Sequence, residues 1–243
     1  VFAAVSRVHK RLRGSYAVVA LIAGKGLLAF RDPYGIRPIC FGSNMQENGK
    51  LEYMVSSESV TMIGLGFKVE RDLAPGEALW IDLKGNVSTR QCAENPVLSP
   101  CAFEWVYFAR PDSTMDGINV YAARLKLGEY LAETLKHEID LSEIDVVMPI
   151  PDSSRPCAQQ LAQVLSLPYR EGFIKNRYVG RTFIQPTQAM RQLGIRLKLN
   201  PLPSVISGKR LVVIDDSIVR GNTSKKLVQM LRDAGAAEVH LRI

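Results

Sequence analysis

The stretch VVIDDSIVRGNTS, from Val212 to Ser224, decides the fold of the second half of the chain. It begins in an apolar run that predicts a buried parallel strand. Two acids, Asp215 and Asp216, follow the run, and a short loop of small and hydroxyl residues follows the acids. Apolar residues at helical spacing then predict a helix that stops at Gly235. We therefore expect a strand–loop–helix unit of an α/β sheet.

The order of residues in this stretch indicates a site for a ribose 5-phosphate. A helix N-terminus offers unpaired N–H groups and partial positive charge, which together hold a phosphate. Gly221 lets the backbone curl close to a ligand, while Thr223 and Ser224 are able to cap the helix. Asp215 and Asp216 are able to accept hydrogen bonds from two ribose hydroxyls, directly or through Mg2+. A strand end with two solvated acids would explain the acids alone, but not the whole run.

This run resembles the signature that binds 5-phosphoribosyl 1-pyrophosphate (PRPP) in type I phosphoribosyltransferases. Its variant DDSIVRGNTS is similar to that of the amidophosphoribosyltransferases. That resemblance implies a glycosyltransferase of purine (IMP) biosynthesis, which converts PRPP, glutamine and water to 5-phosphoribosylamine, glutamate and pyrophosphate. The PRPP-binding residues that it implies are Asp215, Asp216, Ser217, Val219, Arg220, Gly221, Asn222, Thr223 and Ser224.

A second loop follows another buried-strand pattern, Asp145–Ile150, and reads MPIPDSSR (Met148–Arg155). Loops after parallel strands lie where α/β sheets bind ligands, although a capped helix alone would also explain the pattern. A helix over Pro156–Leu165 and a strand over Leu167–Phe173 are expected next. The family resemblance implies a pyrophosphate loop of Asp152, Ser153 and Ser154, and a Mg2+ site of Ser153, Asp215 and Asp216.

Three further strings resemble the same family. RDPYGIRP (Arg31–Pro38) predicts a tight turn after a β-hairpin, and the resemblance implies a structural role below a glutamine site. EWVYFARPDS (Glu104–Ser113) by itself predicts an alternating aromatic strand. KNRYVGRTFIQP (Lys175–Pro186) by itself predicts a solvated loop, and the resemblance implies a lid over PRPP. Lys175 and Arg181 would then be catalytic lid cations, and Tyr107, Tyr178 and Ile184 would line an ammonia passage.

The resemblance also implies the fold class and the domains. Residues 1–92 would be the C-terminal half of an N-terminal-nucleophile (αββα) glutaminase domain, and 93–118 a linker and domain junction. Residues 119–243 would be a type I phosphoribosyltransferase domain with a mainly parallel sheet, truncated at its end. The chain is thus α/β and α+β, and we expect an internal part of a longer enzyme. Because Val1 is not a nucleophile, we expect no glutaminase activity from this polypeptide.

Composition limits the classes of partner. A net charge of +7 is concentrated in a stretch that carries no nucleic-acid motif, so a polyphosphate ligand explains it better. No apolar run approaches the about 20 residues of a membrane span. Four cysteines without metal-type spacing favour a reducing cytoplasm. The cations concerned are Arg170, Lys175, Arg177, Arg181, Arg191, Arg196 and Lys198, with Glu171 as the acid among them.

The family resemblance further implies Mg2+, feedback by purine nucleotides, and a homo-oligomer, either a tetramer or a dimer. Some members carry an iron–sulfur cluster with a ligand at the position of Cys101, but this cysteine alone does not support a cluster. Two alternatives share the PRPP loop. A standalone salvage phosphoribosyltransferase would lack the RDPYGIRP and EWVYFARPDS strings, and a PRPP-sensing transcription regulator would carry a helix-turn-helix, for which we find no pattern.

Overall fold

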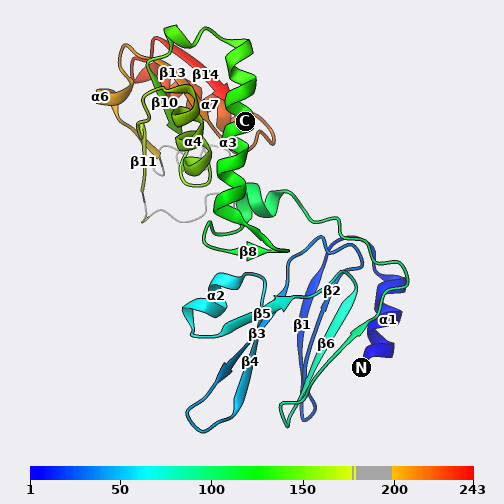
Figure 1. Cartoon of the computed structure of the whole chain (residues 1–243). Coiled ribbons are helices and arrows are strands. Elements are labelled where there is room, and N and C mark those ends of the chain that lie inside the picture. Colours follow the sequence, from blue (N-terminus) through cyan, green and yellow to red (C-terminus); the bar gives the residue numbers. More distant parts are fainter. Residues whose placement is uncertain (177, 179–198) are drawn as a thin grey trace. The chain divides into compact units, whose positions relative to one another are not determined.

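The computed structural model describes residues 1–176, 178 and 199–243. It divides into two compact units, Val1–Tyr121 and Ala122–Ile243 (Figure 1). None of the helices in these described ranges combines the length and the apolar character that a membrane crossing requires. Two residues predicted to act in the lid and the passage, Arg181 and Ile184, lie outside the described residues.

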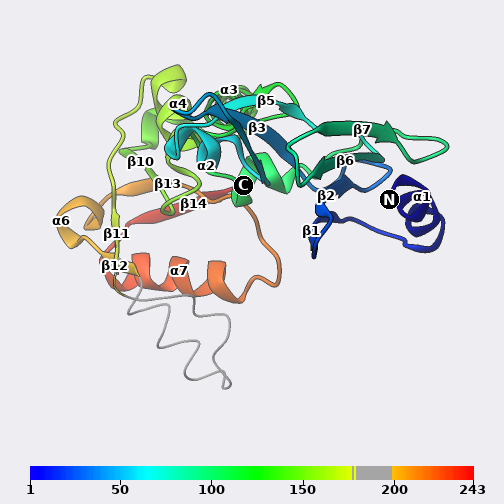
Figure 2. The ribbon, with the colours of Figure 1, turned by 90° about the horizontal axis from the view of Figure 1, so that it is seen from below.

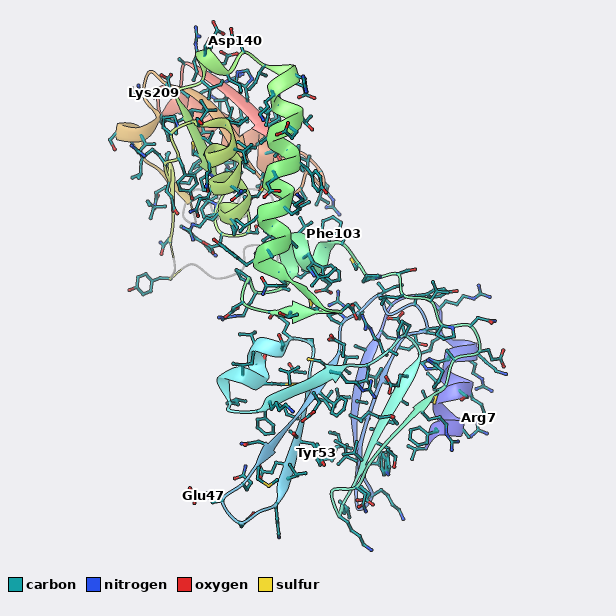
Figure 3. The ribbon with its side chains drawn as sticks, viewed as in Figure 1. Arg7, Glu47, Tyr53, Phe103, Asp140 and Lys209 are labelled. Atoms are coloured by element: carbon teal, nitrogen blue, oxygen red, sulfur yellow. The ribbon has the colours of Figure 1, made fainter. Side chains whose placement is uncertain are left out.

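The first unit contains two antiparallel sheets, with strand orders β1-β2-β6-β7 and β4-β3-β5. The predicted hairpin is present, because β1 pairs with β2 around a turn closed by Lys25 N–H and the Ile22 carbonyl. Glu47 lies at the tip of the β3–β4 hairpin (Figure 3). The elements are α1 (Phe2–Arg11), β1 (Ala17–Ile22), β2 (Gly26–Arg31), β3 (Cys40–Met45), β4 (Leu51–Ser56), α2 (Ser59–Gly64), β5 (Lys68–Asp72), β6 (Glu77–Asp82) and β7 (Val87–Gln91).

Alternation of side chains along β2 and β6 builds two apolar layers in this unit. Ala29 and Leu79 face the second sheet, where they pack with Phe41. Their neighbours Phe30 and Ala78 face the other way and pack against α1. The first unit is therefore layered as a helix on one sheet and that sheet on a second sheet.

The segment Arg31–Pro38 forms the predicted tight turn. The N–H of Gly35 donates to the carbonyl of Asp32 at 3.0 Å, and Gly35 has a φ of +59°, which glycine adopts without strain. The buried Asp32 carboxylate holds the turn from inside. It accepts hydrogen bonds from the backbone N–H groups of Tyr34 at 3.0 Å, Ile36 at 3.1 Å and Arg37 at 3.1 Å.

Arg31, the first residue of this segment, is fully buried and has all five N–H groups paired. Its two Nη atoms bind the carboxylate of Asp116 at 2.7 and 2.8 Å. The other three donors bind the carbonyls of Arg37 at 2.9 Å, Leu73 at 2.8 Å and Gly35 at 2.7 Å. The segment thus has the structural role that the family resemblance implies.

The prediction of an aromatic strand within Glu104–Ser113 is wrong. Glu104–Phe108 is a short π-helix, η1, closed by the bond from Ala109 N–H to the Glu104 carbonyl at 2.9 Å. It pairs with no strand, and its backbone groups are satisfied locally instead. A small hairpin of β8 (Thr114–Met115) and β9 (Ile118–Asn119) follows it.

The second unit is built on a parallel sheet, as the family resemblance implies, and its strand order is β10-β13-β14. α3 and α4 cover one face of this sheet and α7 covers the other, which Figure 2 shows from below. Its elements are α3 (Val120–Glu138), η2 (Leu141–Glu143), β10 (Val146–Pro149), α4 (Arg155–Leu165), β11 (Phe173–Lys175), β12 (Leu199–Pro201), α6 (Pro203–Ile206), β13 (Arg210–Ile214), α7 (Asn222–Asp233) and β14 (Glu238–Arg242).

Every side chain of β13 between Leu211 and Ile214 is buried, alternately against the two helical layers. Leu211 and Val213 pack with α7, while Val212 and Ile214 pack with α3 and α4. The unbroken apolar run in the sequence is therefore that of a strand covered on both faces. The carboxyl ends of β10 and β13 lie side by side, which positions the loops that follow them.

The predicted strand over Leu167–Phe173 is also wrong. Only Tyr169 bridges to Val147, and the chain leaves the sheet after this bridge. Pro168 has no N–H to extend the ladder, so the contact is limited to its carbonyl and the N–H of Arg170. A strand forms further on, as β11, which pairs antiparallel with β12 and not with the parallel sheet.

Candidate active site

The two adjacent acids lie at the carboxyl end of β13, where the ladder with β14 ends. The N–H of Asp215 still bonds the carbonyl of Arg242, at 3.0 Å, so the strand fixes the backbone of the pair. The N–H of Asp216 donates to Asp215 Oδ1 at 2.9 Å. Burial, together with the neighbouring Asp216 charge, raises the pKa of Asp215 to about 6. The site therefore holds one carboxylate whose charge is destabilised until a cation or a donor reaches it.

Ser153 connects the loop after β10 with this acid pair. Its Oγ donates to Asp216 Oδ2, while the hydroxyl of Ser217 donates to Asp216 Oδ1 at 2.7 Å. Two side chains 63 positions apart in the chain thus meet at one carboxylate. A hydroxyl and two carboxylates are the oxygen donors that Mg2+ prefers, and Mg2+ usually takes only one or two carboxylates from a protein. Within the described ranges no group of three or more His, Cys, Asp or Glu side chains could hold a metal.

The loop after the acids leads directly into the N-terminus of α7. Gly221 has a φ of +70° and is the N-cap of this helix. The prediction that Thr223 and Ser224 cap α7 is wrong, because both lie within the helix and no side chain caps it. The first N–H groups of α7 therefore have no capping side chain, which suits an anion. Val219 and Arg220 are exposed on the loop, and Asn222 begins the helix.

The loop after β10 carries a small ionic cluster. Asp152 accepts from Lys175 Nζ through Oδ2 and from Arg155 Nη1 through Oδ1, the latter at 2.7 Å. Arg155 Nη2 donates to Glu171 at 2.9 Å. The peptide bond between Pro151 and Asp152 is cis. These contacts place Lys175, at the end of β11, beside the loop after β10, whose Ser153 contacts Asp216.

Three other residues predicted to act in the site or in the passage differ in their surroundings. Ser154 is buried, and its hydroxyl has no hydrogen-bond partner among the residues that the structure describes. Tyr178 is exposed in the second unit, and Tyr107 is half-exposed on η1 of the first unit.

Sequence reasoning missed Glu171 as part of the site. It also missed that Asp152, in a loop 23 positions away, pairs with Lys175. One signal was available, because Glu171 is the single acid in a stretch that is otherwise strongly basic. An isolated acid among cations is often paired with one of them, but the partner cannot be read from spacing.

Comparison with known proteins follows the same division of the chain. The family model of the phosphoribosyl transferase domain matches residues 119–243. The chain belongs to the phosphoribosyl transferase family. The fold class predicted from the sequence is confirmed by this match and by the parallel sheet of the second unit.

The similarity to known proteins extends beyond the matched domain. The chain is 56% identical over 99% of its length to the amidophosphoribosyltransferase of Pseudomonas aeruginosa, and 51% identical over 99% to that of Escherichia coli. It covers 48% of each, so the chain spans about half the length of these curated relatives. The predicted resemblance to amidophosphoribosyltransferases is thereby confirmed along the whole chain.

A solved structure is similar to both units of the chain. The glutamine PRPP amidotransferase of B. subtilis, complexed with ADP and GMP, superposes with a TM-score of 0.82 at 42% identity. The match covers 97% of this chain and 49% of that one. Because the likeness includes the first unit, a standalone salvage enzyme or a transcription regulator is not favoured.

Proposed function

We propose that the second unit binds PRPP with Mg2+ and transfers its phosphoribosyl group to ammonia, as part of an amidophosphoribosyltransferase. The observation that carries this proposal is the contact of Ser153 with Asp216. It joins the predicted pyrophosphate loop to the acids predicted to bind the ribose, and the pyrophosphate and the ribose are adjacent parts of PRPP. The high identity to amidophosphoribosyltransferases supports the same reaction.

The 5-phosphate would bind at the loop from Ser217 to Ser224. The uncapped N–H groups of α7 and its partial positive charge favour a phosphate there, and Gly221 leaves room for close approach. Asp215 and Asp216 would accept hydrogen bonds from the ribose hydroxyls. Mg2+ held by Ser153, Asp215 and Asp216 would neutralise part of the charge of the pyrophosphate group.

The pyrophosphate end would bind at the loop formed by Asp152, Ser153 and Ser154. As pyrophosphate leaves, C1 of the ribose gains positive character and the leaving group gains negative charge. Lys175 lies beside this loop, so its ammonium group would stabilise that charge. We assign a similar role to Arg181 from its residue type and its place in the KNRYVGRTFIQP string.

Ammonia would then attack C1, and a neutral nucleophile of this kind needs no strong base. We propose that it comes from glutamine hydrolysed elsewhere in the full-length protein, along a passage that includes Tyr107, Tyr178 and Ile184. Residues 1–92 would then be part of the glutaminase domain and 93–118 the junction. Purine synthesis in the cytoplasm, feedback by purine nucleotides and a homo-oligomeric state complete the proposal, and the B. subtilis structure with ADP and GMP supports the feedback.

Ammonia-dependent turnover of PRPP in the full-length protein tests this function. Asp216→Asn should abolish the activity, because it removes the carboxylate that Ser153 and Ser217 both bind. Asp112→Asn is a matched control, since Asp112 is an exposed acid of the first unit that pairs with Arg110 at 2.9 Å. It should leave the rate unchanged. An Asp216→Asn enzyme with the wild-type rate would remove the acid pair from the site.

A further inference from the structure

Four charged side chains of alternating sign form a chain across the loop after β10. We call Lys175, Asp152, Arg155 and Glu171 the loop ion chain. Lys175 Nζ donates to Asp152 Oδ2, Arg155 Nη1 donates to Asp152 Oδ1 at 2.7 Å, and Arg155 Nη2 donates to Glu171 Oε2 at 2.9 Å. Two cations and two anions cancel, so these four groups add no net charge to the loop.

Arg155 is the centre of this chain and is held firmly. Its two Nη atoms bind two different carboxylates, and its Nε is buried with no hydrogen-bond partner among the described residues. Burial, together with the neighbouring Glu171 charge, raises the pKa of Tyr169 to about 12, so Tyr169 stays neutral beside Glu171. A planar guanidinium can bridge two carboxylates in this way, whereas a lysine offers a single point charge. Arg155 is therefore placed to act on the loop through Asp152.

Asp152 presents a difficulty for any pyrophosphate site, because a carboxylate repels the anion that the loop should receive. In the structure its charge is shared between Lys175 and Arg155. When a pyrophosphate group arrives, Lys175 is the partner with the freedom to turn toward it, since its stem is flexible and its ammonium has three donors. Asp152 then keeps only Arg155.

We propose that Arg155, held by Glu171, is a positioning residue. It neutralises the charge of Asp152, so that Lys175 is able to leave Asp152 and bind the pyrophosphate group. This inference rests on the proposed function. It adds two residues, Arg155 and Glu171, to which the proposed reaction assigns no role, and it gives Asp152 the role of holding Lys175 until the ligand binds.

Calorimetric affinity for magnesium pyrophosphate and for magnesium PRPP, measured on the full-length protein, tests the proposal. Arg155→Met should weaken both affinities about tenfold, because Asp152 would stay negative beside the ligand. Adding Asp152→Asn to this variant should restore the affinity, since the unpaired charge is then gone. If Arg155 instead bound the ligand directly, Asp152→Asn would change the affinity by the same factor in the Arg155→Met background as in wild type, and that result would overturn the proposal.

Substitution of Glu171 gives an independent test, because the loop ion chain and simple electrostatics predict opposite changes in ligand affinity. Removal of an acid near a polyphosphate should tighten binding if only its charge matters. The loop ion chain predicts that Glu171→Ala weakens binding, and that it has no further effect in the Arg155→Met background. Glu171→Gln keeps an acceptor for Arg155 and should recover most of the affinity. Tighter binding by Glu171→Ala would refute the positioning role.

Arg210→Met is the matched control. The Arg210 side chain is 43% exposed, against 38% for Arg155, and it also pairs with an acid, Glu143 at 3.1 Å. It begins β13, at the end of the strand away from the acid pair, and Figure 3 shows its neighbour Lys209 at the same end of the unit as Asp140. The Arg210→Met variant should bind magnesium pyrophosphate and magnesium PRPP with the wild-type affinity.

The outcomes separate the two proposals. If wild type binds neither ligand, the proposed function fails and this inference falls with it. If wild type binds both and Arg155→Met binds equally well, the inference alone is refuted. Should Arg155→Met not fold, the comparison of Glu171→Ala with Glu171→Gln makes the same decision.

Discussion

Replacement of Arg31 by Met should destabilise the first unit strongly. The Arg31 side chain is 1% exposed and its partner Asp116 is 10% exposed, so neither charge is solvated. Removal of one partner from a buried ion pair typically costs about 3–5 kcal/mol, because the other charge is left unpaired. Three backbone carbonyls also lose their donor. Against a typical unfolding free energy of about 5–15 kcal/mol, this cost is a large share of the total.

Urea unfolding followed by tryptophan fluorescence measures this cost, because both tryptophans, Trp80 and Trp105, belong to the first unit. The control is Arg110→Met. Arg110 makes a similar two-point contact with Asp112, at 3.0 and 2.9 Å, but the two side chains are 67% and 51% exposed. An exposed pair of this kind contributes little to stability, because solvent screens both charges.

A double-mutant cycle completes the test. Asp116→Ala alone should cost about as much as Arg31→Met, and the double variant should cost clearly less than the sum of the two. Equal unfolding midpoints for Arg31→Met and Arg110→Met would refute the reasoning, since burial would then add nothing to the pair.

Three further predictions concern the second unit. Asp215→Asn should raise the free energy of unfolding, measured by thermal unfolding above pH 6, by about 1–2 kcal/mol, a figure already reduced for the partial exposure of the side chain. The reason is that the pKa of Asp215 in the folded state, about 6, lies above its usual 3.8, so the ionised acid destabilises the fold. The gain should vanish as the pH falls below about 4, where the carboxyl is protonated in both states; a pH-independent gain would contradict this. Lys175→Met should raise the Michaelis constant for PRPP at least about tenfold and leave the Michaelis constant for glutamine unchanged. Equal increases in the two Michaelis constants would contradict the placement of Lys175 at the pyrophosphate group. Gly221→Ala should cost about 1 kcal/mol in urea unfolding and weaken PRPP binding, because alanine is strained at a φ of +70°, whereas no loss of stability would contradict the strain.

The sequence predicts well those elements whose residues are compatible with only one local structure. The run Leu211–Ile214 is apolar throughout, so it has to be covered on both faces, and the acids after it have to lie at a sheet edge. Gly35 and Gly221 occupy the left-handed region that their motifs require. The same apolar pattern predicts that β13 lies in a parallel sheet, but it does not give the strand order.

The remaining features depend on partners that spacing does not reveal. Leu167–Phe173 has the composition of a strand, but Pro168 lacks a donor and the chain leaves β10 after one bridge. The aromatic alternation of Glu104–Phe108 fits a strand, yet no strand lies beside it and a π-helix satisfies its backbone. The pairing of Lys175 with Asp152 joins two loops, and no local pattern predicts a contact of that kind.

Magnesium-dependent binding of PRPP to the full-length protein tests the central claim most directly. Titration calorimetry with PRPP in the presence of Mg2+ should give a single saturable site, and chelation of the metal should weaken it severely. Asp216→Asn should show the same loss of affinity even with Mg2+ present, because Asp216 is the member of the acid pair that Ser153 contacts. Binding that is equally tight without Mg2+ and without Asp216 would contradict the account.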